Sequence, residues 1–497
     1  MPSISERALT AVRWSYAGVV GRVVSQLVAN VILARLLGPE AFGVFAITLL
    51  LVGPAKLASE LGMGSALIQS DSISQEDVHV VFTWLLAVGV LTAIVFFLAA
   101  DRAASFFNSP AAAELIRYAS VIFLFYPISI VAASQLQRNL NLKAIQIASV
   151  GSYAIGFLVV GATCAALGLG SASLIFAFIT QALIDCMLLI AQAKPHLRLR
   201  FQKVDGRLTH FAKRVVPANL TNWILDSVDN FLIGKLFGAK SLGTYAVVFN
   251  LVRTPTGHIA STLQNVLFST SSRIQHDDAR LGRTYIAVIS AVSLIAVPLF
   301  AGVAAIAETC VVALYGNGWK DASPLLVPLA LAMPLHCITA VTGPILWGKG
   351  RVGQELRISL VTGLLLVLAL LLLSTASLVA VVWGVFAVYL IRALWMMATI
   401  ADLCAIRYRR MLDALAPGML LGSVVGVSLF ALNLQLTASG LSALSRLSLG
   451  VLLAMVINMV WLILAGQRSL PDELNYVIKR LIANRPFLEK WWAKCGV

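Results

Sequence analysis

Long apolar runs follow one another along the whole of this 497-residue chain. A helix needs about 20 largely apolar residues to cross a bilayer, and by that measure we expect fourteen membrane spans. Hydrophobic residues make up 59% of the chain and charged residues 12%, against about a quarter charged in soluble domains. The sequence therefore predicts an all-α integral membrane protein. The expected spans are residues 11–34, 42–69, 78–100, 112–134, 143–167, 171–193, 214–237, 242–270, 284–307, 324–347, 355–374, 378–400, 413–435 and 443–466.

Two segments 200 residues apart resemble each other. Residues 30–46 read NVILARLLGPEAFGVFA, and residues 230–246 read NFLIGKLFGAKSLGTYA. The identical pairs are Asn30/Asn230, Leu36/Leu236, Gly38/Gly238, Gly43/Gly243 and Ala46/Ala246. Chance similarity between apolar segments is the alternative, but shared turn glycines in register favour an internal duplication. Each copy would hold six spans, an even number, so we expect parallel repeats with the functional site between them.

Basic residues set the expected topology. Most of the 37 Lys and Arg lie in alternate connections, seven of them in residues 194–214, and this bias places both termini in the cytoplasm. The net charge of +15 therefore reflects membrane orientation, and no nucleic acid partner is expected. The expected domains are an N-terminal lobe (residues 1–193), a basic cytoplasmic linker (194–213), a C-terminal lobe (214–400), two extra helices (401–466) and a basic tail (467–497). The tail is predicted to be either an interfacial amphipathic helix or a disordered segment.

Eight charged residues stand out within the expected spans, where a charge at the bilayer centre costs at least about 2.5 kcal/mol. The basic ones are Arg22, Lys56, Arg253 and Arg392, and the acidic ones are Glu60, Asp185, Asp226 and Asp229. Polar residues three or four positions apart accompany them and give spans 1, 2, 7 and 8 one wet face each. We interpret these faces as a shared cavity in which the four basic side chains bind an anion. Phosphate suits guanidinium groups best, because their fork of donors matches its oxygens.

Other candidates on these faces would line the cavity or couple transport to H⁺ or Na⁺. They are Gln26, Asn30, Glu60, Asn222, Asp226, Asp229, Asn250 and His258. Structural alternatives stay open for several of them. Lys56 and Glu60 are spaced for an i,i+4 ion pair, and a lone intramembrane histidine such as His258 is often a packing residue. Asp226 or Asp229 would neutralise a nearby arginine.

Negative findings limit the chemistry. The six cysteines are scattered without a CxxC pair, so we expect no metal site, and no cofactor is expected. The chain has no GxxxxGK[ST], HExxH or GxSxG motif, which argues against an enzyme.

Resemblance to a known family rests on five segments, ARLLGPEAFGVFAI, LASELGMGSALIQ, LQRNLNLKAIQIASVGS, SVDNFLIGKLFGAKSLGTYAVVFNLV and VLFSTSSRIQHD. Together they resemble the Wzx-type polysaccharide flippases of the multidrug/oligosaccharidyl-lipid/polysaccharide exporter superfamily, over about residues 10–410. The pattern is similar to exopolysaccharide-operon members such as the xanthan-type repeat-unit flippases. Related precursor flippases carry basic cavity residues in spans 1, 2 and 8, where Arg22, Lys56 and Arg253 lie here.

The resemblance implies a V-shaped, two-lobed transporter that works by alternating access. Its cargo would be an undecaprenyl-diphosphate-linked oligosaccharide, moved across the bacterial inner membrane for exopolysaccharide or O-antigen synthesis. Membrane lipids, and the polysaccharide polymerase with its chain-length machinery, are the other expected partners. Two other functions stay open. A cation-coupled multidrug exporter of the same superfamily would favour an acidic or aromatic cavity, and a membrane polysaccharide polymerase or glycosyltransferase would need a sizeable catalytic loop.

Overall fold

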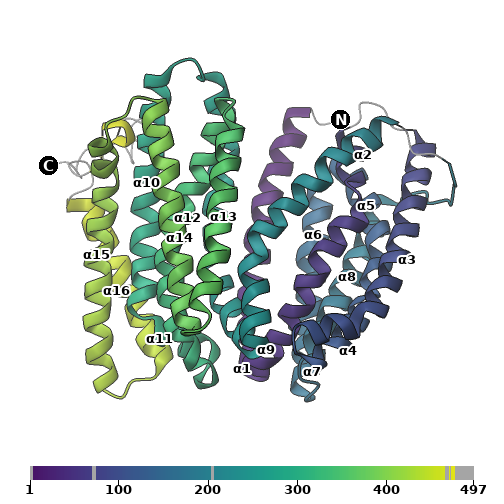
Figure 1. Cartoon of the computed structure of the whole chain (residues 1–497), viewed down its shortest axis with the longest axis horizontal. Coiled ribbons are helices and arrows are strands. Elements are labelled where there is room, and N and C mark those ends of the chain that lie inside the picture. The colour runs from purple at the N-terminus through teal and green to yellow at the C-terminus, as the bar shows by residue number, and fades with distance from the viewer. Residues whose placement is uncertain (1–3, 70–73, 203–205, 465–469, 471, 476–497) are drawn as a thin grey trace. The chain divides into compact units, whose positions relative to one another are not determined.

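The computed structural model describes residues 4–69, 74–202, 206–464, 470 and 472–475, and this part of the chain is helical without any strand (Figure 1). Contacts divide the chain into two compact units, Met1–Val247 and Val248–Val497. This agrees with the predicted all-α membrane protein. Each unit is described by itself below.

The first unit is built from α1 to α8 and the first part of α9. α1 runs through 57 residues and packs most extensively on α6, while α5 packs on α8 and α3. A π-helical segment, η1, joins α6 to α7 and packs on α8. The bounds are α1 Ile4–Glu60, α2 Met63–Gln69, α3 Gln75–Phe106, α4 Pro110–Ala119, α5 Ile122–Arg138, α6 Leu142–Tyr153, η1 Ala154–Gly161, α7 Ala162–Ala166, α8 Ala172–Ala193 and α9 Gly206–Arg273.

The second unit continues from α9 to the C-terminal helices. α10 packs along α15 and α12, and α12 packs along α14. At its centre the buried hydroxyls of Tyr285 and Thr342 are 3.1 Å apart. The bounds are α10 Asp278–Ala305, α11 Ala307–Tyr315, η2 Asn317–Ala322, α12 Ser323–Gly348, α13 Val352–Leu373, α14 Leu378–Leu403, α15 Tyr408–Ala438 and α16 Ala443–Leu464.

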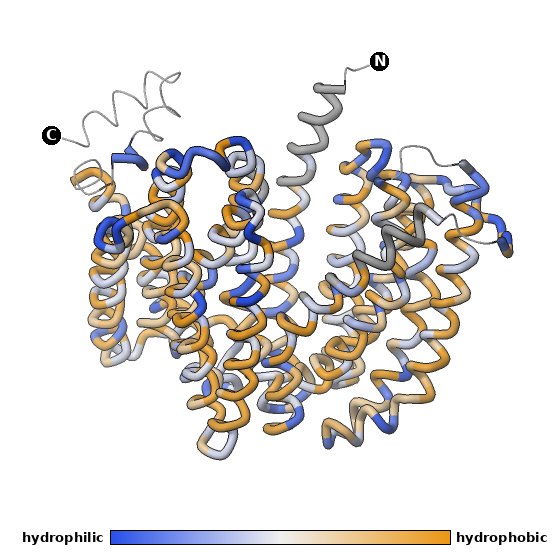
Figure 2. Tube along the Cα trace, turned by 45° about the horizontal axis from the view of Figure 1, so that its top comes forward, coloured by the Kyte–Doolittle hydropathy of each residue, from blue (hydrophilic) through white to orange (hydrophobic). Residues whose placement is uncertain are grey.

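Eleven helices of the described chain are long and apolar enough to cross a membrane, or up to twelve if the bent pair α4 and α5 forms one span. Figure 2 shows the apolar residues along the helix bodies. The count is below fourteen because α1 and α9 each hold two helical arms on either side of a glycine kink and are counted once. The number fourteen and the layout in two repeats stay predictions.

The two duplicated turns have the same backbone geometry. Gly38 has φ 74° and ψ 175°, and Gly238 has φ 79° and ψ 179°, which interrupt α1 and α9 at equivalent places. Only glycine adopts this region without strain. Five residues further on, a Cβ on Gly43 would lie 1.7 Å from the carbonyl oxygen of Ala239. A Cβ on Gly243 would lie 2.0 Å from that of Pro39, so the two turns cross backbone to backbone.

The unit boundary lies within α9, at Val247/Val248, and not in the linker that the sequence suggests as the division. The reason is that the first part of α9 packs on α1 through the crossing of Gly43 and Gly243. The domain limits expected from the sequence follow the two repeats, whereas this division follows contacts. The two cannot be compared directly, so the expected limits stay predictions.

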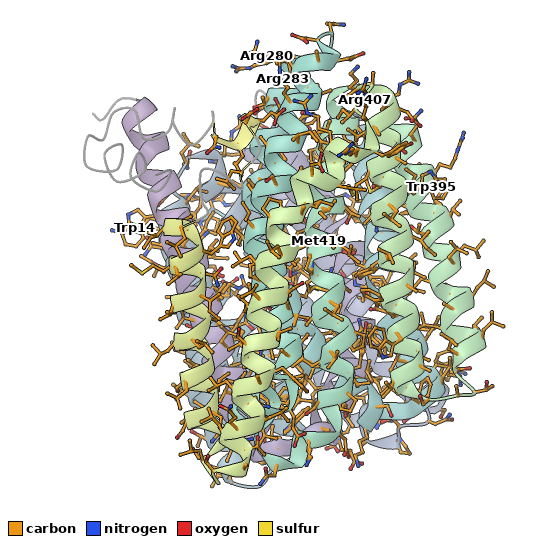
Figure 3. The ribbon with its side chains drawn as sticks, turned by 90° about the vertical axis from the view of Figure 1, so that its left-hand side faces the viewer. Trp14, Arg280, Arg283, Trp395, Arg407 and Met419 are labelled. Atoms are coloured by element: carbon orange, nitrogen blue, oxygen red, sulfur yellow. The ribbon has the colours of Figure 1, made fainter. Side chains whose placement is uncertain are left out.

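Basic residues of the second unit gather at one end of its helices. Figure 3 shows Arg280 and Arg283 of α10 at the same end of the unit as Arg407, which lies at the beginning of α15, while Met419 lies further along that helix. These arginines come from two connections that the charge pattern places on the same side of the membrane. The arrangement is compatible with the predicted topology.

Candidate functional site

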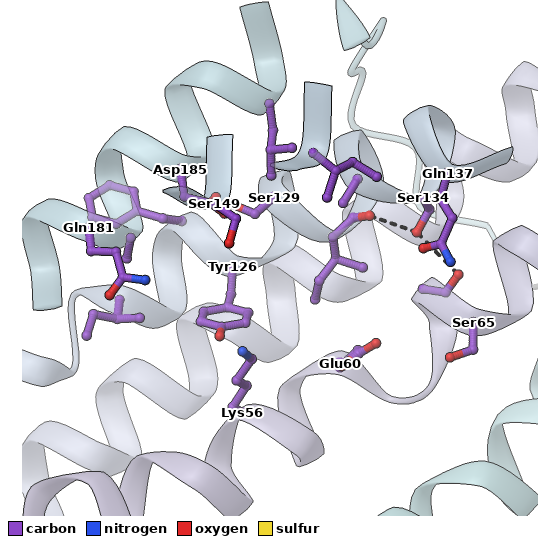
Figure 4. Close-up of a pocket in the computed structure, with 18 of the residues that line it drawn as sticks. Lys56, Glu60, Ser65, Tyr126, Ser129, Ser134, Gln137, Ser149, Gln181 and Asp185 are labelled. Atoms are coloured by element: carbon purple, nitrogen blue, oxygen red, sulfur yellow. Dashed lines mark hydrogen bonds between the residues drawn. The ribbon is translucent and has the colours of Figure 1, made fainter. Parts of the chain in front are cut away.

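A cavity of about 520 Å³ lies inside the first unit, within the range of small-molecule sites. It is lined by α1, α2, α5, α6 and α8, and four of its side chains carry charge. These are Arg22, Lys56, Glu60 and Asp185, of which Figure 4 labels the last three. The polar neutral lining is Ser65, Tyr126, Ser129, Ser134, Gln137, Ser149 and Gln181.

Arg22 and Lys56 come from the two arms of α1. Arg22 donates a hydrogen bond of 2.7 Å from Nη1 to the hydroxyl of Ser149 on α6. The ammonium group of Lys56 lies 4.3 Å from the centre of the Tyr126 ring on α5, a cation–π distance (Figure 4). Both basic side chains therefore contact neutral partners, Ser149 and Tyr126, and both are exposed.

Glu60 ends α1 at the cavity wall. The helix stops there because Leu61 and Gly62 both have positive φ, 49° and 64°. Helix α2 begins directly after this break and brings Gly64 so close to Glu60 that a Cβ on the glycine would lie 3.0 Å from Oε1. The break turns the carboxylate toward the cavity that α2 and α5 line.

The four charged groups share the cavity without forming ion pairs. Among the described residues, none of the four has an opposite charge within 4.0 Å. Lys56 still interacts electrostatically with Glu60, Arg22 and Asp185. The i,i+4 ion pair of Lys56 with Glu60, one of the structural alternatives, is not formed. Because the two carboxylates do not pair closely with the two cations, the cations can still bind an anionic ligand.

Several lining residues are not among the candidates chosen from the sequence. Tyr126, Ser129, Ala133 and Gln137 lie three or four positions apart on α5, and Gln181 and Asp185 lie four apart on α8. The signal was present as helical spacing of polar residues within apolar spans. Asp185 stood out by its charge alone. Its span, residues 171–193, was not predicted to have a polar face, unlike spans 1, 2, 7 and 8.

The remaining candidates of α1 lie outside this cavity. Gln26 and Asn30 follow Arg22 by one and two turns and are half-buried, but they do not line the cavity. Their role in a larger cavity stays a prediction.

Asp229 is held by hydrogen bonds within the first unit. It is 4% exposed, and its Oδ2 accepts a hydrogen bond of 2.6 Å from the hydroxyl of Tyr245, across the turn at Gly238. Its Oδ1 accepts from the backbone and side-chain nitrogens of Asn230, at 2.7 and 3.0 Å. In the first copy of the duplicated segment, Ala29 and Phe45 occupy the two equivalent positions. The hydrogen bond between Asp229 and Tyr245 thus links the two arms of α9. Ala29 and Phe45 cannot form such a bond between the two arms of α1.

We expect the Tyr245→Phe variant to lower the thermal stability of the protein. Removing the hydroxyl takes one donor from a buried carboxylate, which costs about 1–3 kcal/mol. The measurement is the apparent melting temperature in detergent. The control is Tyr118→Phe, because Tyr118 makes a similar 2.6 Å hydrogen bond to Glu114 on an exposed surface. Equal melting temperatures for wild type and Tyr245→Phe would contradict this role.

Other candidates of α9 lie on both sides of the unit boundary. Asp226 and Asn250 are exposed. The guanidinium carbon of Arg253, in the second unit, lies 5.3 Å from the centre of the Phe249 ring. The side chains of Asn222 and His258 lie outside the described part of the structure.

Arg392 belongs to the second unit, on α14. Its Nη2 donates a hydrogen bond of 3.0 Å to Ser359 and lies 3.7 Å from a carboxylate oxygen of Glu355, both on α13. The structure thus brings Arg22, Lys56 and Glu60 together in one cavity, and places Arg253 and Arg392 in the other unit. No cluster of metal-binding side chains occurs among the residues that the structure describes.

Comparison with known proteins identifies relatives of the chain. The family profile described as "Polysaccharide biosynthesis protein" matches residues 32–324. The succinoglycan biosynthesis transport protein ExoT of Rhizobium meliloti is 28% identical over 70% of this chain and 71% of its own. The teichuronic acid biosynthesis protein TuaB of Bacillus subtilis is 22% identical over 91% of this chain and 94% of its own. The lipopolysaccharide biosynthesis protein WzxC of Escherichia coli is 22% identical over 70% and 72%.

Solved structures share the fold. The lipid II flippase MurJ in an inward closed conformation superposes with a TM-score of 0.70, over 91% of this chain and 99% of its own, at 12% identity. An inward-facing multidrug transporter of the MATE family superposes with a TM-score of 0.56, over 77% and 95%, at 16% identity. Both similarities support the fold inferred from the sequence.

Proposed function

Because the chain belongs to the polysaccharide biosynthesis protein family, we propose that it is a flippase for a lipid-linked oligosaccharide. The cargo is an oligosaccharide repeat unit on undecaprenyl diphosphate, moved across the bacterial inner membrane for exopolysaccharide or O-antigen synthesis. Relatives named for transport in succinoglycan synthesis and for lipopolysaccharide synthesis support this class of cargo. The narrower xanthan-type assignment stays a prediction.

The strongest support for the proposal is the pair of basic side chains in the cavity. Arg22 and Lys56 share a cavity inside a membrane unit, and neither is within 4.0 Å of a carboxylate in the described chain. A charge in a span needs a partner, water or a ligand, because burial alone is costly. A diphosphate would form the close ion pairs that Glu60 and Asp185 do not form with these cations, and the cations would replace part of the water that it loses on entering the membrane. Its sugars would lie against the neutral polar lining, and its lipid tail would stay in the bilayer.

The finer architecture belongs to the same proposal. Dividing α1 at Gly38 and α9 at Gly238 adds two spans to the twelve and gives fourteen, in two parallel repeats of six and two further helices. We infer that both termini are cytoplasmic and that the two lobes alternate between inward and outward openings. Arg253 and Arg392 would join the diphosphate site from the second lobe, with Gln26, Asn30, Asn222, Asp226, Asp229, Asn250 and His258 as further polar or coupling residues.

Glu60 and Asp185 keep a second candidate open, a cation-coupled exporter. Two carboxylates without an ion pair in the same cavity suit a cation, whether as cargo or as coupling H⁺ or Na⁺. The two candidates differ in the sign of the cargo. A flippase loses transport when a basic lining residue is removed, and a cation exporter loses it when an acidic one is removed. An interaction with the polysaccharide polymerase stays a prediction for this protein.

The test is a leaflet-accessibility assay in proteoliposomes. Undecaprenyl diphosphate carrying a fluorescent oligosaccharide is placed in both leaflets, and a membrane-impermeant quencher is added outside. We expect quenching to stop at the outer-leaflet fraction in protein-free vesicles and to continue beyond it when the protein is present. Efflux of a cationic dye, measured in parallel, tests the exporter. Quenching that stops at the outer leaflet, together with dye efflux, would exclude the flippase in favour of the exporter.

A further inference from the structure

The connection between α8 and α9 carries apolar side chains where a soluble loop would carry polar ones. Residues 194–202 are basic and form neither helix nor strand, yet Leu199 is 62% exposed and Phe201 is 80% exposed. Exposed aromatic and aliphatic side chains of this size usually mark a contact surface. We call residues 194–202 the linker segment.

The linker segment is attached along the first turns of α3. The backbone oxygen of His196 lies 2.9 Å from Nε2 of His79, and the backbone N–H of Arg200 donates to the hydroxyl of Thr83 at 2.7 Å. Arg200 also forms an ion pair of 2.8 Å with Glu76. The segment is thus fixed to a membrane helix at several points.

The same attachment sets the depth of the linker segment. The indole N–H of Trp84 donates to the backbone oxygen of Gln202 at 2.9 Å. α3 has 32 residues, about 48 Å at 1.5 Å per residue, whereas the hydrocarbon layer is about 30 Å thick. The excess, shared between both ends, leaves about 9 Å of α3 in each headgroup layer. His79 and Trp84 are about 6 and 13 Å along the helix, so the linker segment extends from the headgroups to the edge of the hydrocarbon.

The exposed face of α3 indicates what surrounds the segment. Trp84 begins an exposed stripe of large apolar residues on this helix, continued by Leu91, Val95 and Leu98. Tryptophan is typical of the membrane interface, where its ring is in apolar surroundings and its N–H is hydrogen-bonded. Leu197 is partly buried and packs on the core formed by α2, α3 and α5. Leu199 and Phe201, further along the linker segment, are exposed like the residues of that stripe.

Lys194 and Arg198 are exposed on this segment, whereas Arg200 is paired with Glu76. Lipid phosphates lie at the depth of the headgroups, and anionic lipids attract basic segments there. We infer that the linker segment lies in the bilayer interface, with Leu199 and Phe201 among the upper acyl chains and with Lys194 and Arg198 on anionic phospholipid headgroups. The inference does not depend on the cargo of the transporter.

The test uses a photoreactive side chain in the full-length protein. Phe201→p-benzoylphenylalanine is reconstituted in nanodiscs of phosphatidylcholine and phosphatidylglycerol, irradiated, and analysed by intact mass spectrometry. We expect phospholipid adducts at position 201. The matched control is Asn139→p-benzoylphenylalanine, an exposed position in the polar turn between α5 and α6, where several-fold fewer adducts are expected. No adduct at 201, or equal yields at 201 and 139, would overturn the inference.

The basic residues give a second readout. In the position-201 variant we expect phosphatidylglycerol adducts to exceed its share of the lipid mixture. Adding Arg198→Gln should reduce this preference about fivefold, the effect of one cation near an anionic surface. Arg102→Gln, at an exposed site near the other end of α3, should leave it unchanged. A preference unaffected by Arg198→Gln would show that Arg198 does not hold anionic headgroups.

Discussion

Replacing Arg22 by glutamate should strongly slow translocation of the lipid-linked oligosaccharide, and so should Lys56→Glu. Each change puts a negative group where we propose that the diphosphate binds, and losing one partner of a desolvated charge pair costs about 2–5 kcal/mol. The transport rate should fall between about 30-fold and several thousandfold. Arg22→Lys should be milder, because an ammonium group keeps the charge and loses the forked donors.

The measurement is the rate of outer-leaflet appearance in the accessibility assay, normalised to the amount of reconstituted protein. Arg102→Glu reverses an exposed charge outside the cavity and is the matched control. Glu60→Gln and Asp185→Asn separate the two candidate functions, since only the exporter requires these carboxylates for its cargo. Normal translocation by both Arg22→Glu and Lys56→Glu would refute the assignment of the site.

Valine at Gly43 or Gly243 should destabilise the first unit strongly. A Cβ at these positions would overlap the carbonyl oxygens of Ala239 and Pro39, and backbone atoms cannot rotate away as a side chain can. Overpacking usually costs about 1–3 kcal/mol, and contact with backbone places these sites at or above the upper end. The apparent melting temperature and the yield of monodisperse protein should both fall.

The double variant Gly43→Ala/Gly243→Ala tests whether the two sites act as one contact. If the turns separate to accommodate the first methyl group, the second should cost less than it does alone, so the effects should not add. Gly353→Ala on α13, where nothing lies within 4 Å of the added methyl group, should leave the melting temperature unchanged or raise it slightly. Additive effects at Gly43 and Gly243 would mean that the two sites do not act as one contact. Negligible effects would mean that the backbones are not in close contact there.

The fold class followed from the sequence because hydrophobicity and length decide whether a segment crosses a membrane. The segments 143–167 and 171–193, expected as spans, correspond to candidate spans Leu142–Ala166 and Ala172–Ala193. The backbone geometry within α1 and α9 was harder to predict from the sequence. The repeat in residues 30–46 and 230–246 located both turns, but not that each turn is a kink at a single glycine, Gly38 or Gly238, with a helical arm directly on either side.

The site was predicted in part for a similar reason. Arg22, Lys56 and Glu60 stood out because charges are rare in spans, and they do line one cavity. Tyr126 and Gln181 were missed because such residues are common in membrane helices, and only the packing of α5 and α8 shows which face is inward. Asp229 stood out by its charge, but its hydrogen bonds to Tyr245 and Asn230 could not be read from spacing.

The continuity of α9 has a consequence for dividing the gene. The helix passes from one compact unit into the other at Val247/Val248, so a cut there would sever a helix in its middle. A cut in the connection between Ala193 and Gly206 would leave every helix whole, and the second fragment would then carry the turn at Gly238, whose contacts at Pro39 and Gly43 belong to the first. Two co-expressed fragments made in this way would hold a ready recognition surface for one another, and such a split offers a route to labelling each half of the transporter separately.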